Sequence, residues 1–330
     1  MPYYLPDKFI FKHHFTFFLY DILAKIVKTG EEKGIFYHSI NLKDIDEAEK
    51  LKNIPDADIL DYLNKNGYEA DADEIIKKQI FDAILSDFLH YVYTALDTSE
   101  KAKLSVSFAL LRKPFKDNLF ILEWLLADPH DFLRKFQSNN SNTEIAIDKI
   151  SPERKKSIIS TSNSKIKFPF LPDDYLYEIR YDKTKLYGLE SMWNKANHLI
   201  TSCKNYSTED MNLNFVFSQE NDKINQWESF YTLLPGLLMY TIFVSDAIYR
   251  TFSDDTSIVN IDLIVRILYG FELANNQLIN SEKRTPLETL PIFCKKCKTE
   301  IYLNETIDDM IYEKGYCKCI KGHKNYIFEI

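Results

Sequence analysis

The chain has 330 residues, of which 45% are hydrophobic and 27% charged; this composition suits a folded core and excludes a disordered or fibrous protein. Only 8 residues are glycine, and their positions allow neither the glycine-rich loops that bind phosphate nor a G-x-S-x-G nucleophile turn. The formal net charge of −8 excludes an overall positive field, so any contact with nucleic acid or anionic lipid must use a local patch.

Apolar residues at three- and four-residue spacing predict long helices through most of the chain. The clearest helix is predicted over 71–98, where one face is formed by Ile76, Ile80, Ile84, Phe88 and Val92. The same periodicity predicts helices over 9–28, 102–112, 115–126, 176–202, 224–252 and 258–279. Pro114 lacks an amide donor and disfavours a helical residue before it, so we expect the chain to turn or kink there.

The long uncharged run, Ser229–Ser245, contains Pro235 and Gly236. It is shorter than the roughly 20 residues that span a bilayer, so we interpret it as a buried core helix and expect no membrane partner. The first residues lack the basic start and the small-residue cleavage site of a secretory signal. We therefore expect a cytoplasmic protein.

Composition divides the chain into four parts. The stretch 138–168 is rich in serine and asparagine, which predicts a linker or mobile insertion. It separates an N-terminal helical half, 1–137, from a C-terminal half, 169–287, although the two halves could pack as one domain. Short stretches that alternate apolar and polar residues predict strands in a separate module over 288–330. The predicted fold class is therefore mainly α, a multi-helix bundle with a small C-terminal β module.

Four of the five cysteines lie in this last module, as Cys294-x2-Cys297 and then, after nineteen residues, Cys317-x-Cys319-x3-His323. This spacing is typical of a tetrahedral zinc site in a reducing compartment. We predict the ligands to be Cys294, Cys297, Cys319 and His323, because glycine just before the histidine favours a short reversing loop. Cys317 is the alternative ligand, and a set that uses both Cys317 and Cys319 would leave His323 free.

The segment from Phe293-Cys-Lys-Lys-Cys297 to Cys319-x3-His323-x-Asn325-x-Ile327 resembles the zinc ribbons, a family of small β modules. The resemblance covers only residues from about 288 onward and implies a metal and a fold, but no partner, because zinc ribbons bind nucleic acid, bind proteins or staple a terminus. A standard zinc ribbon has two C-x2-C pairs. Here the second pair is replaced by Cys317-x-Cys319-x3-His323. Four protein ligands would close the coordination sphere, so we expect a structural rather than a catalytic zinc.

Three lysines, Lys318, Lys321 and Lys324, stand among the last ligands, with no acidic residue between Tyr316 and Phe328. They could contact phosphate groups or form a solvated loop. The basic residues of 151–168 form a second candidate patch: Arg154, Lys155, Lys156, Lys165 and Lys167. The favoured function is a zinc-stabilised interaction or regulatory protein that contacts nucleic acid, rather than an enzyme.

Two other functions stay open. Arg112, Lys116 and Asn118 surround Pro114 and could contact nucleic acid or form the site of a helical effector nuclease; alternatively, Arg112 could pair with Asp117 or Glu123 inside the bundle. Long-helix proteins of this size include the HEPN ribonucleases, whose motif is arginine followed after four to six residues by histidine, and no arginine here has that spacing. The other candidate is a protein-binding scaffold of undetermined oligomeric state.

Overall fold

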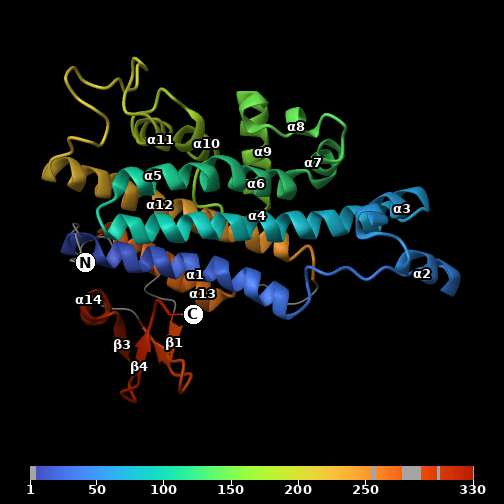
Figure 1. The fold of residues 1–330 in the computed structure, drawn as a ribbon. Coiled ribbons are helices and arrows are strands. Elements are labelled where there is room, and N and C mark those ends of the chain that lie inside the picture. Colours follow the sequence, from blue (N-terminus) through green and yellow to red (C-terminus); the bar gives the residue numbers. More distant parts are fainter. Residues whose placement is uncertain (1–4, 254–257, 277–290, 303–304, 330) are drawn as a thin grey trace.

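The computed structural model describes residues 5–253, 258–276, 291–302 and 305–329. Within them, the chain forms a body of helices and a small β module that lies at one end of it, below α1 (Ile10–Glu32) and α13 (Ile261–Asn276) in Figure 1. The predicted fold class, mainly α with a small C-terminal β part, is confirmed.

Long helices give the body its shape. Helix α1 packs against α4 (Glu69–Glu100) and α12 (Glu220–Tyr249), and α4 packs against α5 (Leu104–Arg112). The remaining helices of the body are η1 (Asp7–Phe9), α2 (Ile45–Lys52), η2 (Asp56–Asp58), α3 (Ile59–Lys65), η3 (Lys113–Asn118), α6 (Leu119–Ala127), α7 (Pro129–Phe136), α8 (Ser141–Glu144), η4 (Ile147–Lys149), α9 (Pro152–Lys165), α10 (Asp173–Tyr181) and α11 (Leu189–Asn197). Buried residues of both predicted halves belong to one contiguous core, whereas α2 and α3 flank a small cluster of their own.

Helix α12 contains the uncharged run and lies inside the core. It is the one described helix that is long and apolar enough to cross a membrane. However, 94% of its most apolar 18-residue window is buried inside the structure. Pro235 and Gly236 are buried within the helix. The prediction of a core helix is therefore confirmed.

Two predicted helical segments differ in detail from the structure. At Pro114 the chain stays helical through a π turn, η3, in which the amide of Leu119 donates to the carbonyl of Pro114. The predicted helix over 176–202 is two helices, α10 and α11. They are separated at Asp182, whose Oδ1 accepts from the amide of Thr184 at 2.8 Å and so competes with helix formation.

The stretch 138–168 is predicted to be a linker or mobile insertion, and its second half forms helix α9. Ser151 caps this helix by accepting from the amide of Arg154 at 3.2 Å, and Pro152 occupies the first turn, where its missing amide costs nothing. Ile158 and Ile159 are buried, and α9 packs against α6. Burial of two isoleucines against the body therefore outweighs the polar composition.

The β module consists of two hairpins with a helix between them. Strand β1 (Ile292–Phe293) pairs antiparallel with β2 (Glu300–Ile301), and β3 (Tyr316–Lys318) pairs antiparallel with β4 (Lys324–Tyr326). Helix α14 (Glu305–Lys314) lies between the hairpins in sequence and packs against β3. The sequence predicts only strands here, so α14 is an unexpected element.

Phe328 joins the module to the body. Its ring makes edge-to-face contacts with Phe11, Phe15 and Phe18 of α1, with ring centroids 5.3 to 5.6 Å apart. A Cβ at Gly270 of α13 would lie only 2.3 Å from the ring of Phe15 and 2.6 Å from that of Phe328. Glycine therefore lets α13 approach this aromatic cluster.

Candidate metal centre

The first knuckle is the turn between β1 and β2, and it carries Cys294 and Cys297. The amide of Cys294 donates to the carbonyl of Thr299, and the amide of Lys298 donates to the carbonyl of Cys294, both at 2.9 Å. Lys298 has a φ of 58°, in the left-handed region that a residue with a side chain adopts only at a cost. This closed turn directs both sulfur atoms to the same side.

The second knuckle is the turn between β3 and β4, and it carries Cys319 and His323. The amide of Cys319 donates to the carbonyl of His323 at 3.1 Å, and that of Gly322 donates to the carbonyl of Cys319 at 2.8 Å. Gly322 has a φ of 78°, which glycine adopts without steric cost. The predicted reversing loop with glycine before the histidine is confirmed.

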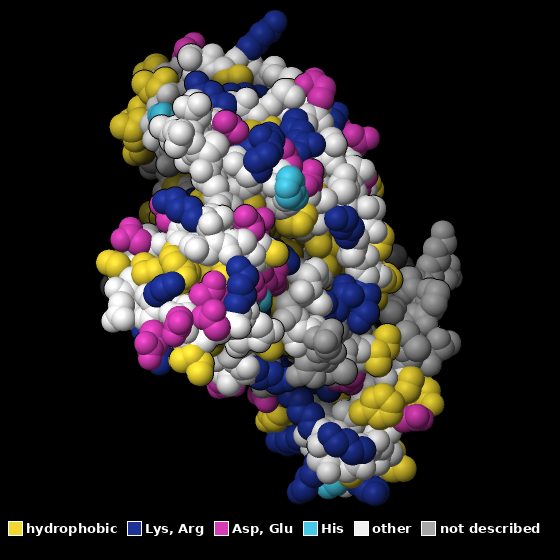
Figure 2. Space-filling view, turned by 90° about the vertical axis from the view of Figure 1, so that its right-hand side faces the viewer, with side chains coloured by type: hydrophobic (Ala, Val, Ile, Leu, Met, Phe, Trp, Pro, Cys, Tyr) yellow, Lys and Arg dark blue, Asp and Glu magenta, His cyan; other side chains and the backbone are white. Residues whose placement is uncertain are grey.

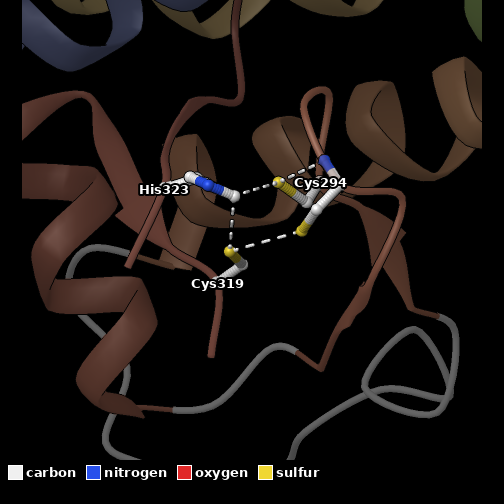
Figure 3. Close-up of side chains that lie close together, drawn as sticks. Cys294, Cys319 and His323 are labelled. Carbon is white, nitrogen blue, oxygen red and sulfur yellow. Dashed lines mark hydrogen bonds between the residues drawn. The ribbon is translucent and has the colours of Figure 1, made fainter. Parts of the chain in front are cut away.

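The two knuckles bring four ligand atoms together, three cysteine sulfurs and one histidine nitrogen, all within 4.8 Å of one another. The Nδ1 atom of His323 lies 3.8 Å from the Sγ of Cys294 and 3.6 Å from the Sγ of Cys319. The sulfurs of Cys297 and Cys319 are 3.8 Å apart. Figure 3 shows the labelled side chains of Cys294, Cys319 and His323 pointing toward one another. This cluster could hold a metal ion.

Cys317 lies outside the cluster of four. It is on strand β3, fully buried and in register with Asn325 of β4. Strand β3 ends at Lys318, so Cys319 leaves the strand and joins the turn that carries His323. Cys317 keeps the inward direction of the strand. The structure therefore brings together the predicted ligands Cys294, Cys297, Cys319 and His323, without the alternative ligand.

The thiols of the site have different affinities for protons. The hydroxyl and amide of Thr299 hydrogen-bond to the sulfur of Cys297 and lower its pKa to about 6. Burial opposes ionisation of Cys294, but hydrogen bonds from nearby amides outweigh it and its pKa is lowered. Burial raises the pKa of Cys319 and raises that of Cys317 to about 11. Because thiolate is the form that binds metal, the lowered pKa of Cys297 favours metal binding.

Asn325 joins the two knuckles and is a residue whose role sequence reasoning missed. Its Oδ1 accepts from the amide of Lys295 at 2.9 Å, and its Nδ2 donates to the carbonyl of His323 at 2.9 Å. It is 3% exposed. The sequence did contain a sign of this role. Asn325 is a polar residue at an inward position of a strand, where an apolar residue is usual.

Lysines surround the two knuckles on the outside. The three predicted contact residues, Lys318, Lys321 and Lys324, are exposed, as are Lys295, Lys296 and Lys298 of the first knuckle. Figure 2 shows lysine and arginine side chains gathered around a histidine on the lower end of the molecule, over the β module. The segments that carry these lysines, 293–299 and 316–328, contain no acidic residue. The end of the module is therefore positively charged.

Two of the other candidate contact residues, Lys116 and Asn118, are engaged inside the body. Lys116 is 7% exposed and pairs with Glu190 at 2.8 Å, and Asn118 donates to Asp87 at 2.7 Å. Arg112 is half-buried, and the carboxylate of Glu123 pairs with Arg180 instead. These contacts leave Lys116 and Asn118 little freedom to bind an external phosphate.

Two residues of the basic stretch 151–168, Arg154 and Lys165, also contact other parts of the body. Arg154 pairs with Asp131 at 2.8 Å. Lys165 donates to the last carbonyls of α6, those of Leu126 and Ala127, where a cation stabilises a helix end. Arg154 and Lys165 therefore stabilise the body.

Comparison with protein-family models, with curated proteins and with solved structures finds no match.

Proposed function

We propose that this protein is a helical protein whose C-terminal module is held together by a structural zinc ion and binds nucleic acid through the lysines around that ion. The observation that carries the proposal is the convergence of three cysteine sulfurs and one histidine nitrogen within 4.8 Å. The positive charge of the surface around these four residues then indicates that the binding partner is nucleic acid.

The spacing of the ligand atoms fits zinc. Zinc lies about 2.3 Å from sulfur and about 2.0–2.1 Å from nitrogen in tetrahedral sites, so neighbouring ligands are about 3.8 Å apart for two sulfurs and about 3.6 Å for sulfur and nitrogen. The corresponding distances here are 3.8 Å from Cys297 to Cys319 and 3.6 Å from Cys319 to His323. Soft thiolate ligands also favour zinc over calcium, magnesium or manganese.

A structural role follows from the ligand count. Three thiolates and one imidazole fill a tetrahedral sphere and leave no position for a reacting water. In the described part of the module both sheets have two strands, and such sheets are marginal on their own in water. Structural zinc supplies an apparent ~10–16 kcal/mol in small modules, so the ion would hold the two hairpins together and fix the surface that they present.

Nucleic acid is the partner that best fits the surface. Three thiolates and a divalent ion leave one net negative charge, which the six lysines of the two knuckles, Lys295, Lys296, Lys298, Lys318, Lys321 and Lys324, more than neutralise. Phosphate backbones bind such lysine clusters and release counterions as they do so. The rest of the chain is acidic, so this positive end should orient a polyanion toward the module.

The zinc part of the proposal is tested by replacing the ion with Co²⁺. The full-length protein should take up one Co²⁺ per chain and show the visible absorption of tetrahedral cobalt with thiolate ligands, which zinc then abolishes. An absorption spectrum of octahedral cobalt, or no uptake, would contradict the zinc site.

The nucleic-acid part is tested by salt titration of the zinc-loaded protein with a fluorescent 20-base-pair duplex. Affinity should fall linearly with salt on logarithmic axes. Replacing Lys318, Lys321 and Lys324 together by glutamine should reduce the slope by roughly 1 for each of these lysines that binds a phosphate. The matched control replaces exposed lysines of α2 and α3 by glutamine, at Lys50, Lys52 and Lys65, and should leave the slope unchanged. No binding at low salt would overturn this part of the proposal.

A further inference from the structure

The β3–β4 hairpin presents an outer face of two tyrosines and two lysines, here called the ribbon face. Tyr316 is in register with Tyr326, and Lys318 is in register with Lys324. The pair between them, Cys317 and Asn325, points inward, as the alternating burial of both strands shows. Because side chains on alternate positions of a strand share a face, all four outer residues lie together.

The two tyrosines of the ribbon face differ from most aromatic residues of the chain, which fill the helical core. Their rings are 5.5 Å apart and tilted by 56°, and Tyr326 is 39% exposed as a residue. The ammonium of Lys324 lies 4.5 Å from the centre of the ring of Tyr316. Aromatic rings on strands beside lysines are the combination with which proteins bind single-stranded nucleic acid.

The positive charge on the ribbon face also favours binding of a polyanion. Like charges directly opposite each other on paired strands are destabilising, and Lys318 faces Lys324 in this way. Both side chains are exposed. A phosphate between the two ammonium groups would relieve this repulsion.

A cleft of about 520 Å³ continues from Tyr326 toward α1. Ile311, Phe11 and Phe328 give it apolar walls, and Lys314 and His14 also line it. It also contains two acidic side chains, Asp7 and Glu329, which would repel a phosphate but can accept hydrogen bonds from the amino groups of a base. The cleft therefore suits a base whose phosphate stays outside, on the lysines.

We infer that the ribbon face binds single-stranded nucleic acid, with a base stacked on Tyr326 and phosphates held by Lys318 and Lys324. The inference rests on the proposed nucleic-acid function and adds the form of the ligand. In a duplex the faces of the bases are covered by their neighbours, so a duplex can contact only the lysines.

The first experiment compares three fluorescent probes on the zinc-loaded full-length protein: a 12-nucleotide oligothymidine, an abasic strand with the same number of phosphates, and a 12-base-pair duplex. Stacking increases affinity by about 5- to 150-fold per base. Oligothymidine should therefore bind at least about fivefold more tightly than the abasic strand and the duplex. Equal binding of oligothymidine and the abasic strand would overturn the inference while leaving the proposed function intact. No binding of any probe at low salt would overturn both.

The second experiment assigns the preference to the ribbon face. Tyr326→Leu should weaken oligothymidine binding about fivefold or more and leave binding of the abasic strand unchanged, because leucine keeps apolar bulk but cannot stack. The matched control is Tyr302→Leu, a tyrosine of the same module that is 54% exposed but lies off the ribbon face. Equal effects of the two variants would contradict the assignment. Zinc content reports whether Tyr326→Leu folds. If it does not fold, the comparison of oligothymidine with the abasic strand on the wild-type protein tests the inference by itself.

Discussion

A single buried side chain, Asn325, holds the two halves of the candidate metal centre in register. It receives one hydrogen bond from the first knuckle and gives one to the second, so neither knuckle can shift without breaking a hydrogen bond. Groups that orient metal ligands in this way contribute to affinity although they do not touch the ion.

We therefore predict that Asn325→Leu, which keeps a branched side chain of similar shape but removes both hydrogen bonds, lowers zinc affinity about 10- to 100-fold. Affinity is measured by competition with a chromogenic chelator. Asn212→Leu, at an exposed position before α12, serves as the control and should bind zinc like the wild type. An unchanged affinity in Asn325→Leu would show that the ion alone fixes the knuckles.

His13 makes the stability of the body depend on pH. It is 3% exposed, and its Nδ1 lies 2.6 Å from the hydroxyl of Tyr231. Burial, with a smaller effect of the neighbouring His14, lowers the pKa of His13 to about 4. Above the unfolded pKa of about 6.5 both states are neutral. As the pH falls from there toward 4, only the unfolded state takes up the proton, so stability is lost, by about 3 kcal/mol in total.

The variant His13→Gln should remove this contribution. The difference in unfolding free energy between wild type and variant is measured by urea denaturation at pH 7 and at pH 4. It should shift by up to about 3 kcal/mol in favour of the variant at the lower pH. A difference that stays constant across this range would contradict a neutral, buried His13.

At the scale of elements, one buried ion pair joins α6 to α10. Arg180 and Glu123 are both fully buried and 2.6 Å apart, and Arg180 also donates to the carbonyl of Leu176. Removing one partner leaves an uncompensated charge, so Glu123→Gln should destabilise the protein by about 3–5 kcal/mol. Replacing both residues by leucine should cost much less. Denaturation curves of the three proteins test this, and equal losses in the single and double variants would contradict it.

We expect the joint between α1 and the β module to couple the candidate metal centre to the body. Phe328→Ala removes the ring that packs on three phenylalanines of α1, so we expect a loss of about 2–4 kcal/mol. All three tryptophans, Trp124, Trp193 and Trp227, are buried in the body and report its unfolding by fluorescence. In the wild type a chelator should lower this unfolding temperature, and in Phe328→Ala by less. Phe136→Ala on α7 is the control, and an equal chelator effect in all three proteins would show that the joint transmits nothing.

The elements that could be predicted from the sequence are those in which one periodicity dominates. The regular apolar positions from Ile76 to Val92 give α4, and the spacing of the ligands with Gly322 before His323 gives the metal cluster. The rest depends on contacts distant in sequence. The two isoleucines of α9 order a polar stretch only because α6 lies beside them. Asn325 can hydrogen-bond to both knuckles only when β3 pairs with β4.

At the scale of the whole molecule, charge is unevenly distributed. The chain has a net charge of −8, yet the lysines of the knuckles gather at the end of the module (Figure 2). We expect this asymmetry to orient a polyanion toward the module and to keep it off the body. We expect the arrangement to depend on metal binding at the candidate centre, because an ion there would hold both lysine-bearing turns in place.

The most direct test of this account is the metal content of three full-length proteins purified in the same way: wild type, Cys294→Ser and Cys317→Ser. We predict one zinc per chain in the wild type and in Cys317→Ser, because Cys317 lies outside the cluster, and a loss of zinc from Cys294→Ser. Loss of zinc from Cys317→Ser to the same extent, or a wild type that binds no metal, would contradict the ligand set on which the proposed function rests.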